Sequence, residues 1–154
     1  DLIGRKKFKR PLDMGCGSGI LSIAIAKAWR VPVRAVDMDT HAVIVARDNI
    51  RRNGVAPLVR AMKSNGYSSP QVTQPGGYDL IVSNILANPL CRMAKQLAQT
   101  LRQSTEGGGI VILAGFYDHD ANRVYAAHYR QGFRLLRRYY INGWQTLMLE
   151  RRAG

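Results

Sequence analysis

The chain has 154 residues, of which 46% are hydrophobic and 21% charged, a balance typical of one globular domain. No apolar run approaches the roughly 18 residues of a membrane span, which argues against a membrane protein. The net charge of +13 favours phosphate-rich partners. However, the basic residues form short clusters in different segments, a pattern that also suits simple solvation of the surface.

The two cysteines indicate the compartment. Cys16 and Cys91 provide neither a disulfide framework nor a metal-ligand spacing, so we expect a reduced, cytoplasmic setting and no metal. The basic start of the chain is not followed by the apolar core of a secretory signal.

Strand-like and helix-like patterns alternate along the chain. We predict, in chain order, a strand over 11–15, a helix over 20–29, a strand over 33–38, a helix over 42–54, a strand over 58–62, a loop over 63–77, a strand over 78–84, a helix over 88–103, a strand over 107–115, a helix over 118–132, and strands over 133–141 and 144–152. Asp39 or Thr40 is expected to cap the second helix and Gly54 to end it. Asn142–Gly143 is a strong hairpin signal between the last two strands.

This alternation predicts the fold class. It favours a Rossmann-like α/β domain over residues 1–154, with a seven-stranded, mostly parallel sheet, helices on both faces and a C-terminal antiparallel hairpin. In such folds ligands bind beyond the carboxyl ends of the strands, so candidate residues are those that directly follow strands.

The stretch "LDMGCGSGI" predicts a cofactor site. Gly15, Gly17 and Gly19 follow the first strand and open a helix, where backbone N–H groups and close approach favour a bound nucleotide. Asp13 precedes the glycines, and Asp37 ends the second strand 22 positions after Gly15, where a carboxylate can accept both ribose hydroxyls. The G-x-G-x-G spacing departs from the G-x-G-x-x-G of dinucleotide sites.

"LDMGCGSGILSIAIAK" followed by "AVDMD" resembles the cofactor site of seven-strand methyltransferases that use S-adenosylmethionine, and the terminal hairpin is similar to theirs. The resemblance implies that Asp37 holds the ribose and that Gly15 and Gly17 pack against the methionyl-ribose portion. It also implies that Asp13 orients the amino-acid end and that Met38 lines the adenine. A cofactor-binding domain without catalysis, or an NAD-binding module, is the alternative.

The fourth predicted strand ends in "SNILANPL", with Asn84 as its last residue. Methyltransferases that act on base amines usually have two prolines and an aromatic after this position, whereas this chain has Ile-Leu-Ala. "SNILANPL", "AGFYDHDANRV" and "NGWQTLMLERR" resemble the enzymes that methylate large-subunit ribosomal protein eleven, over residues 11–152.

That resemblance implies methyl transfer to lysine side chains or an α-amine of a large-subunit ribosomal protein, with rRNA contact through the basic surface. Members of the family also have an N-terminal substrate-recognition domain, which we do not find in residues 1–154. An RNA amino-group methyltransferase is the alternative that the basic charge supports.

Asn84 is the predicted catalytic residue. Its side-chain carbonyl can accept an N–H from a neutral amine and so point the nitrogen lone pair at the methyl group, next to the cofactor that it also contacts. The alternative role is a cap on the following helix. No catalytic role is predicted for Cys16, where a tight loop requires a small side chain. Asp118, His119 and Asp120 are interpreted as cap and first-turn residues, and Trp144 as hairpin packing.

Overall fold

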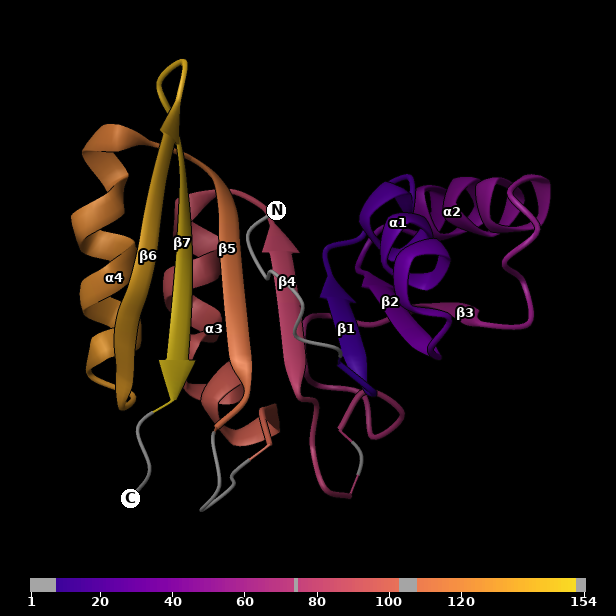
Figure 1. Cartoon of the computed structure of the whole chain (residues 1–154), viewed down its shortest axis with the longest axis horizontal. Helices are drawn as coiled ribbons and strands as arrows, with labels where there is room; N and C mark the ends of the chain where they lie inside the picture. Colours follow the sequence, from indigo (N-terminus) through magenta and orange to yellow (C-terminus); the bar gives the residue numbers. More distant parts are fainter. Residues whose placement is uncertain (1–7, 74, 103–107, 152–154) are drawn as a thin grey trace.

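The structure is a computed structural model that describes residues 8–73, 75–102 and 108–151 (Figure 1). Its centre is a seven-stranded sheet with the order β3-β2-β1-β4-β5-β7-β6. The elements, in chain order, are β1 Pro11–Met14, α1 Ile20–Trp29, β2 Val33–Asp37, α2 Thr40–Arg52, β3 Val59–Lys63, β4 Leu80–Asn84, α3 Ala87–Thr100, β5 Ile110–Tyr117, the 3-10 turn η1 Asp118–Asp120, α4 Ala121–Tyr129, β6 Phe133–Ile141 and β7 Trp144–Arg151. The predicted fold class is therefore confirmed.

The strand order creates a switch point in the middle of the sheet. Strands β1 to β5 run parallel, and the chain first builds outward from β1 through β2 to β3 before it returns to β4 on the other side of β1. Strand β7 lies antiparallel between β5 and β6, as the hairpin signal predicts. The carboxyl ends of β1 and β4 are thus neighbours at the point where ligands bind in open α/β sheets.

Helices cover both faces of the sheet because alternate strand residues point to opposite sides. On one face, Ile23 of α1 and Val43 of α2 join a buried cluster with Ala35 of β2. On the other face, the larger cluster joins Leu90 of α3 and Val124 of α4 to the sheet, and Figure 1 shows these two helices behind β5, β6 and β7. In the described part of the chain, no helix has the length and apolar character needed to cross a bilayer.

The largest differences from the predicted boundaries are at two helices. The predicted helix over 88–103 ends at Thr100, because Leu101 turns to an extended conformation and bridges Tyr78. The predicted helix over 118–132 begins with a 3-10 turn, because the backbone N–H of Asp118 donates a hydrogen bond to the carbonyl of Gly143 (3.1 Å) and so holds this residue to the terminal hairpin. The α-helix itself covers only Ala121–Tyr129. Predicted strand residues at 107 and 152 lie outside the described residues.

Candidate cofactor and acceptor site

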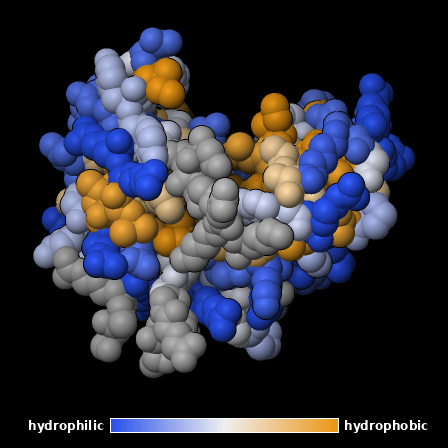
Figure 2. Space-filling model, viewed as in Figure 1, coloured by the Kyte–Doolittle hydropathy of each residue, from blue (hydrophilic) through white to orange (hydrophobic). Residues whose placement is uncertain are grey.

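The predicted site residues meet at the carboxyl edge of the sheet. The glycine loop follows β1, Asp37 ends β2, Asn84 ends β4 and Tyr117 ends β5, so parallel pairing brings all four segments to one edge. Several large apolar side chains are exposed at these strand ends and on the hairpin: Ile20, Met38, Leu86, Tyr117, Ile141 and Trp144. Figure 2 shows hydrophobic surface on both sides of a hollow at the upper margin of the view, over the hairpin tip and over α1.

Backbone hydrogen bonds fix the glycine loop to the neighbouring strand. The N–H groups of Gly15 and Cys16 both donate to the carbonyl of Val36, at 2.7 and 2.9 Å. Gly15 and Gly17 have φ values of 77° and 52°, a region that side-chain-bearing residues rarely adopt. A Cβ on Gly15 would lie 2.4 Å from Cγ2 of Ile85, whereas a Cβ on Gly17 would meet nothing within 4 Å. Gly15 therefore permits close packing inside the protein, and Gly17 faces open space that a ligand can enter.

This contrast predicts different outcomes for two alanine substitutions. Gly15→Ala should destabilise the fold by roughly 2–3 kcal/mol, because it adds both backbone strain and a clash. Gly17→Ala should cost only about 1 kcal/mol of strain but should weaken S-adenosylmethionine binding, because the new methyl group occupies the open side of the loop. Denaturant unfolding and calorimetric titration measure the two quantities. Full cofactor affinity in Gly17→Ala would show that the ligand does not approach there.

Asp37 is held by the loop that it faces. One carboxylate oxygen accepts the N–H of Gly17 and the other accepts the N–H of Asp39, both at 2.9 Å. A carboxylate has about four acceptor positions, so both oxygens keep capacity for ribose hydroxyls. Asp39 itself caps α2 by accepting the N–H of His41 at 2.9 Å, which confirms the predicted cap.

Asp13 is a buried carboxylate with one unsatisfied oxygen. Its Oδ2 accepts both the Ser22 hydroxyl (2.6 Å) and the Ser22 amide (3.1 Å). Its Oδ1 is buried and has no hydrogen-bond partner among the described residues. The pKa of this carboxyl is raised from 3.8 to about 6, chiefly because the group is buried. The Ser22 hydrogen bonds lower the pKa, and the nearby charge of Asp37 raises it further. An anion buried without a cation fits the ammonium group of a bound amino-acid cofactor.

The shifted pKa of Asp13 predicts a pH-dependent stability. Because the folded pKa of about 6 exceeds the unfolded value of 3.8, the native state binds more protons between these pH values, and stability should fall as pH rises through this window. The loss is on the order of 3 kcal/mol. Asp13→Asn should flatten this slope and raise the melting temperature at pH 8, whereas the exposed cap variant Asp39→Asn should keep the slope. An unchanged slope in Asp13→Asn would contradict the prediction.

Asn84 is exposed at the last position of β4, where it pairs with Ala114 of β5. The N-cap of α3 is Leu86, and no side chain makes a capping hydrogen bond there, so the alternative role of Asn84 as a helix cap is not supported. Strand β5 has an irregular register between Leu113 and Phe116. Within it, Gly115 has a φ of 89°, and a Cβ there would lie 2.8 Å from Oδ1 of Asn84. Gly115 thus leaves the room in which the Asn84 amide lies.

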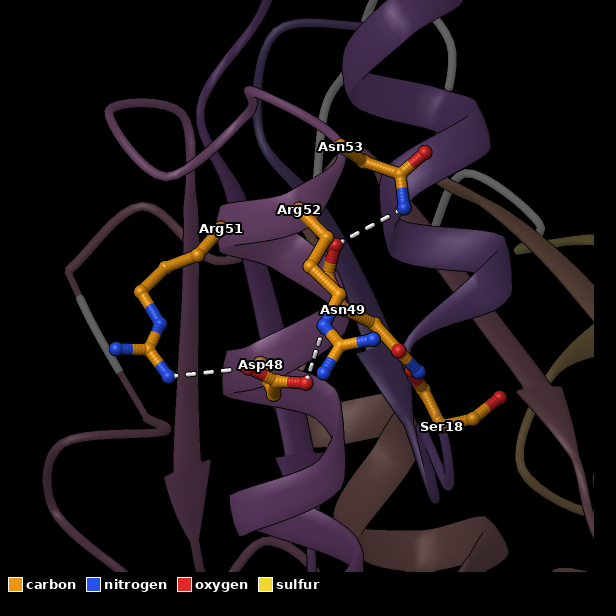
Figure 3. Close-up of polar contacts among 6 residues, drawn as sticks. All are labelled: Ser18, Asp48, Asn49, Arg51, Arg52 and Asn53. Atoms are coloured by element: carbon orange, nitrogen blue, oxygen red, sulfur yellow. Dashed lines mark hydrogen bonds and ion pairs between the residues drawn. The ribbon is translucent and has the colours of Figure 1, made fainter.

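Three polar residues that the sequence analysis missed support the site. The Ser22 hydroxyl and amide hold Asp13, and the Ser83 hydroxyl donates to the carbonyl of Met14 (2.8 Å) at the end of β1. The Asn49 amide of α2 donates to the carbonyl of Ser18 (2.9 Å), and Figure 3 shows this side chain extending from the helix toward the glycine loop. The position of Ser22 and Ser83 inside the apolar runs "ILSIAIAK" and "LIVSN" could have indicated buried serines near the site. Nothing in the sequence around Asn49 indicates its contact with the glycine loop.

An aromatic pair lies at the same edge. The rings of Tyr117 and Trp144 stack with centroids 4.3 Å apart, and both side chains are about half exposed. Trp144 therefore packs against Tyr117 of β5, outside the hairpin, and keeps an exposed face. The hairpin is held in place because Asp118 accepts hydrogen bonds from Gln145 (2.6 Å) and Arg138 (3.0 Å).

The residues without a predicted catalytic role have structural explanations. Burial raises the pKa of the Cys16 thiol to about 12, so it stays protonated at neutral pH. Asp120 precedes α4 as expected, but its carboxylate pairs with Arg123 (2.6 Å) and makes no capping hydrogen bond, which corrects that part of the prediction. Within the described ranges, no three His, Cys, Asp or Glu side chains are grouped so that they could hold a metal ion.

This strand order, with a glycine loop at the switch point and an acid at the end of β2, defines a methyltransferase-type α/β fold of the seven-strand class. Residues 4–152 match the family model described as ribosomal protein L11 methyltransferase (PrmA). The chain belongs to this family.

Individual relatives agree with this assignment. The chain is 44% identical over 138 residues to a ribosomal protein L11 methyltransferase of Rhodopseudomonas palustris, covering 90% of the chain and 45% of that protein. It is 39% identical over 150 residues to one from Rhizobium rhizogenes, covering 97% and 50%. A crystal structure of ribosomal protein L11 methylase from Lactobacillus delbrueckii superposes with a TM-score of 0.84 at 27% identity, covering 97% of this chain and 72% of the other. The chain thus spans about half the length of the curated relatives it matches.

A further structural neighbour shares the fold alone. An RNA methyltransferase from Salinibacter ruber, solved in complex with S-adenosyl-L-homocysteine, has a TM-score of 0.70 at 17% identity and covers 92% of this chain and 80% of the other.

Proposed function

We propose that this protein transfers methyl groups from S-adenosylmethionine to amino groups, lysine side chains or an α-amine, of ribosomal protein L11 in the cytoplasm. The family match over residues 4–152 is the observation that carries the proposal. The position of the glycine loop, Asp37 and Asn84 at one edge of the sheet supports the proposal.

Four residues fit the cofactor. The carboxylate of Asp37 would accept the ribose hydroxyls, and the unsatisfied Oδ1 of Asp13 would face the positive charge of the amino-acid end. The open side of Gly17 leaves space for close approach, and the exposed thioether of Met38 directly follows Asp37 as an apolar contact for adenine. When bound, the cofactor supplies an electrophilic methyl group.

Asn84 would position the acceptor. Only a neutral amine has a lone pair available, and a partly desolvated cleft lowers the pKa of a lysine and favours that form. The Asn84 carbonyl accepts one N–H of the amine and so orients the lone pair. The amine nitrogen forms the new N–C bond as the S–C bond breaks, and the product nitrogen then loses its proton to water. Placement in line supplies much of the rate acceleration, so no strong base is required.

The first experiment uses the full-length protein, methyl-labelled S-adenosylmethionine and ribosomes from a strain that lacks the activity. Protease should release the label, and peptide mapping should place it on protein L11. Release by nuclease instead would replace this acceptor with RNA, the second candidate, which the net charge of +13 favours. Absence of label from both fractions would contradict both candidates.

A further inference from the structure

We propose that the amino edge of the sheet, opposite the cofactor edge, is a binding site for an RNA backbone. The inference rests on the proposed function, because a ribosomal acceptor places RNA beside the enzyme. The site is a hollow of about 580 Å³ at the starts of β1, β2 and β3. Its lining includes four cationic side chains: Lys9, Arg10, Arg34 and Arg60. We refer to these four residues and their hollow as the amino-edge basic site.

No acidic side chain lines this hollow, and none of its four cations forms an ion pair within the part of the chain that the structure describes. The adjacent acid, Asp79, accepts the backbone N–H groups of Lys9 (2.7 Å) and Arg10 (2.9 Å). Asp79 therefore fixes the backbone of this segment, and its single negative charge beside four cations leaves the site with a net positive charge.

Two of the guanidinium groups are held close to the same buried tyrosine. Arg10, Arg34 and Tyr78 line the same hollow. Burial raises the pKa of the Tyr78 hydroxyl, and the charges of Arg34 and Arg10 both oppose that rise. Arg34 donates to the carbonyl of Gln71, and Arg10 donates to that of Pro75 (2.8 Å). Each guanidinium has five donors, so several remain for a ligand. Like charges held close together repel, and a bound phosphate offsets that cost.

A second hollow, of about 500 Å³, continues the basic surface along α2 and β3 and shares Arg60 with the first. Arg47 and Arg51 also line it. Arg47 donates to the carbonyl of Ala61 (3.1 Å), and Arg51 is partly neutralised by Asp48. Two adjoining hollows suit an extended chain of phosphates better than a single small anion. Guanidinium groups bind carboxylate and phosphate oxygens alike in a bidentate manner. The regular spacing of phosphates along an RNA backbone, rather than the geometry of a single contact, therefore favours RNA over an acidic protein strand of irregular charge spacing.

The amino-edge basic site lies at the opposite edge of the sheet from Asn84, so RNA binding and methyl transfer would use different surfaces. Lys9 and Arg10 precede β1, and Arg34 and Arg60 are the second residues of β2 and β3, whereas Asn84 ends β4. Bound RNA would therefore leave the acceptor edge free, and the amino-edge basic site would act as an anchor.

The test measures binding of a fluorescently labelled single-stranded RNA to the full-length protein by anisotropy at several salt concentrations. Arg34→Gln/Arg60→Gln should weaken binding about tenfold or more and reduce the slope of log affinity against log salt by roughly 1.4, at about 0.7 per single-strand phosphate contact. The matched control, Arg92→Gln/Arg130→Gln, makes the same charge change at two exposed positions outside both hollows, one in α3 and one just after α4, and should change affinity less than about twofold.

Equal losses in both double variants would overturn the inference in favour of non-specific attraction, and no loss in either would overturn it outright. Displacement of the RNA by polyglutamate at equal charge concentration would assign the surface to an acidic protein instead. Methyl transfer to isolated protein L11 should be unchanged in both double variants. Because this assay contains no RNA, its failure in the wild-type protein would refute the proposed function separately.

Discussion

Asn84→Ala is expected to lower the turnover of methyl transfer by about 100-fold to 1000-fold while changing S-adenosylmethionine affinity by less than about threefold. The substitution removes the side-chain carbonyl that we propose accepts an N–H from the acceptor, so the nitrogen lone pair would lose its alignment. The backbone of the site should persist, because the amide of Ile85 still donates to the carbonyl of Ala114 (3.1 Å) and Ser83 still holds β1. Single-turnover kinetics and calorimetric titration measure the two quantities.

Two further variants test whether the loss of turnover comes from the Asn84 side-chain oxygen. Asn84→Asp keeps an acceptor oxygen and should retain more turnover than the alanine variant. Asn88→Ala removes an exposed amide four positions later, in the first turn of α3, and should leave turnover within about twofold, as is usual for an exposed position. Comparable losses in Asn84→Ala and Asn88→Ala would assign the effect to the loop as a whole. A matching drop in cofactor affinity would make Asn84 a cofactor residue alone.

Asp37→Ala should weaken S-adenosylmethionine binding by about 100-fold or more. The substitution would remove the two charge-assisted hydrogen bonds to the ribose that we propose for this carboxylate, each worth about 1.5–3 kcal/mol. It also releases the N–H of Gly17, so the glycine loop loses its contact with the end of β2. Calorimetric titration with S-adenosylmethionine, and with the more stable S-adenosylhomocysteine, measures the loss.

The neighbouring acid provides the matched control. Asp39→Asn removes the same charge two positions away, and an asparagine still caps α2 as well as an aspartate does, so affinity should change by less than about threefold. Equal losses in Asp37→Ala and Asp39→Asn would mean that the effect is the net negative charge of this region. An unaffected Asp37→Ala variant would exclude the ribose role.

The fold could be predicted from local patterns. Apolar runs such as "LIVSN" and helical stretches such as "ILSIAIAK" follow one another in an order that only a mostly parallel sheet accommodates, and Asn142–Gly143 marks the antiparallel end. Parallel pairing then brings residues that end different strands to one edge, which is why the sequence alone predicts that Asp37 and Asn84 lie at the same edge. Local propensity predicted the ends of elements less well where a long-range contact ends them. The helix α3, for example, stops before Leu101 because this residue pairs with Tyr78.

The details of the site depend on contacts between distant residues. Nothing local distinguishes Asn49 from other exposed amides, and its hydrogen bond to Ser18 exists only because α2 packs beside the glycine loop. The unsatisfied oxygen of Asp13 is likewise a property of its buried surroundings, to which Ser22 contributes from the first turn of α1. The amino-edge basic site joins residues from three strand starts that are far apart in the chain.

The absence of a side chain at Gly115 has a consequence for sequence variation in this protein. Any Cβ at this position would lie 2.7 Å from the backbone N and O atoms of Ile85, in a region of φ that other residues avoid. Backbone atoms cannot move aside as a flexible side chain does, so the residue opposite the Asn84 amide has almost no freedom to change. Selection from a library that randomises Gly115 should therefore return glycine alone, whereas the exposed Leu86 beyond Ile85 should accept many residues.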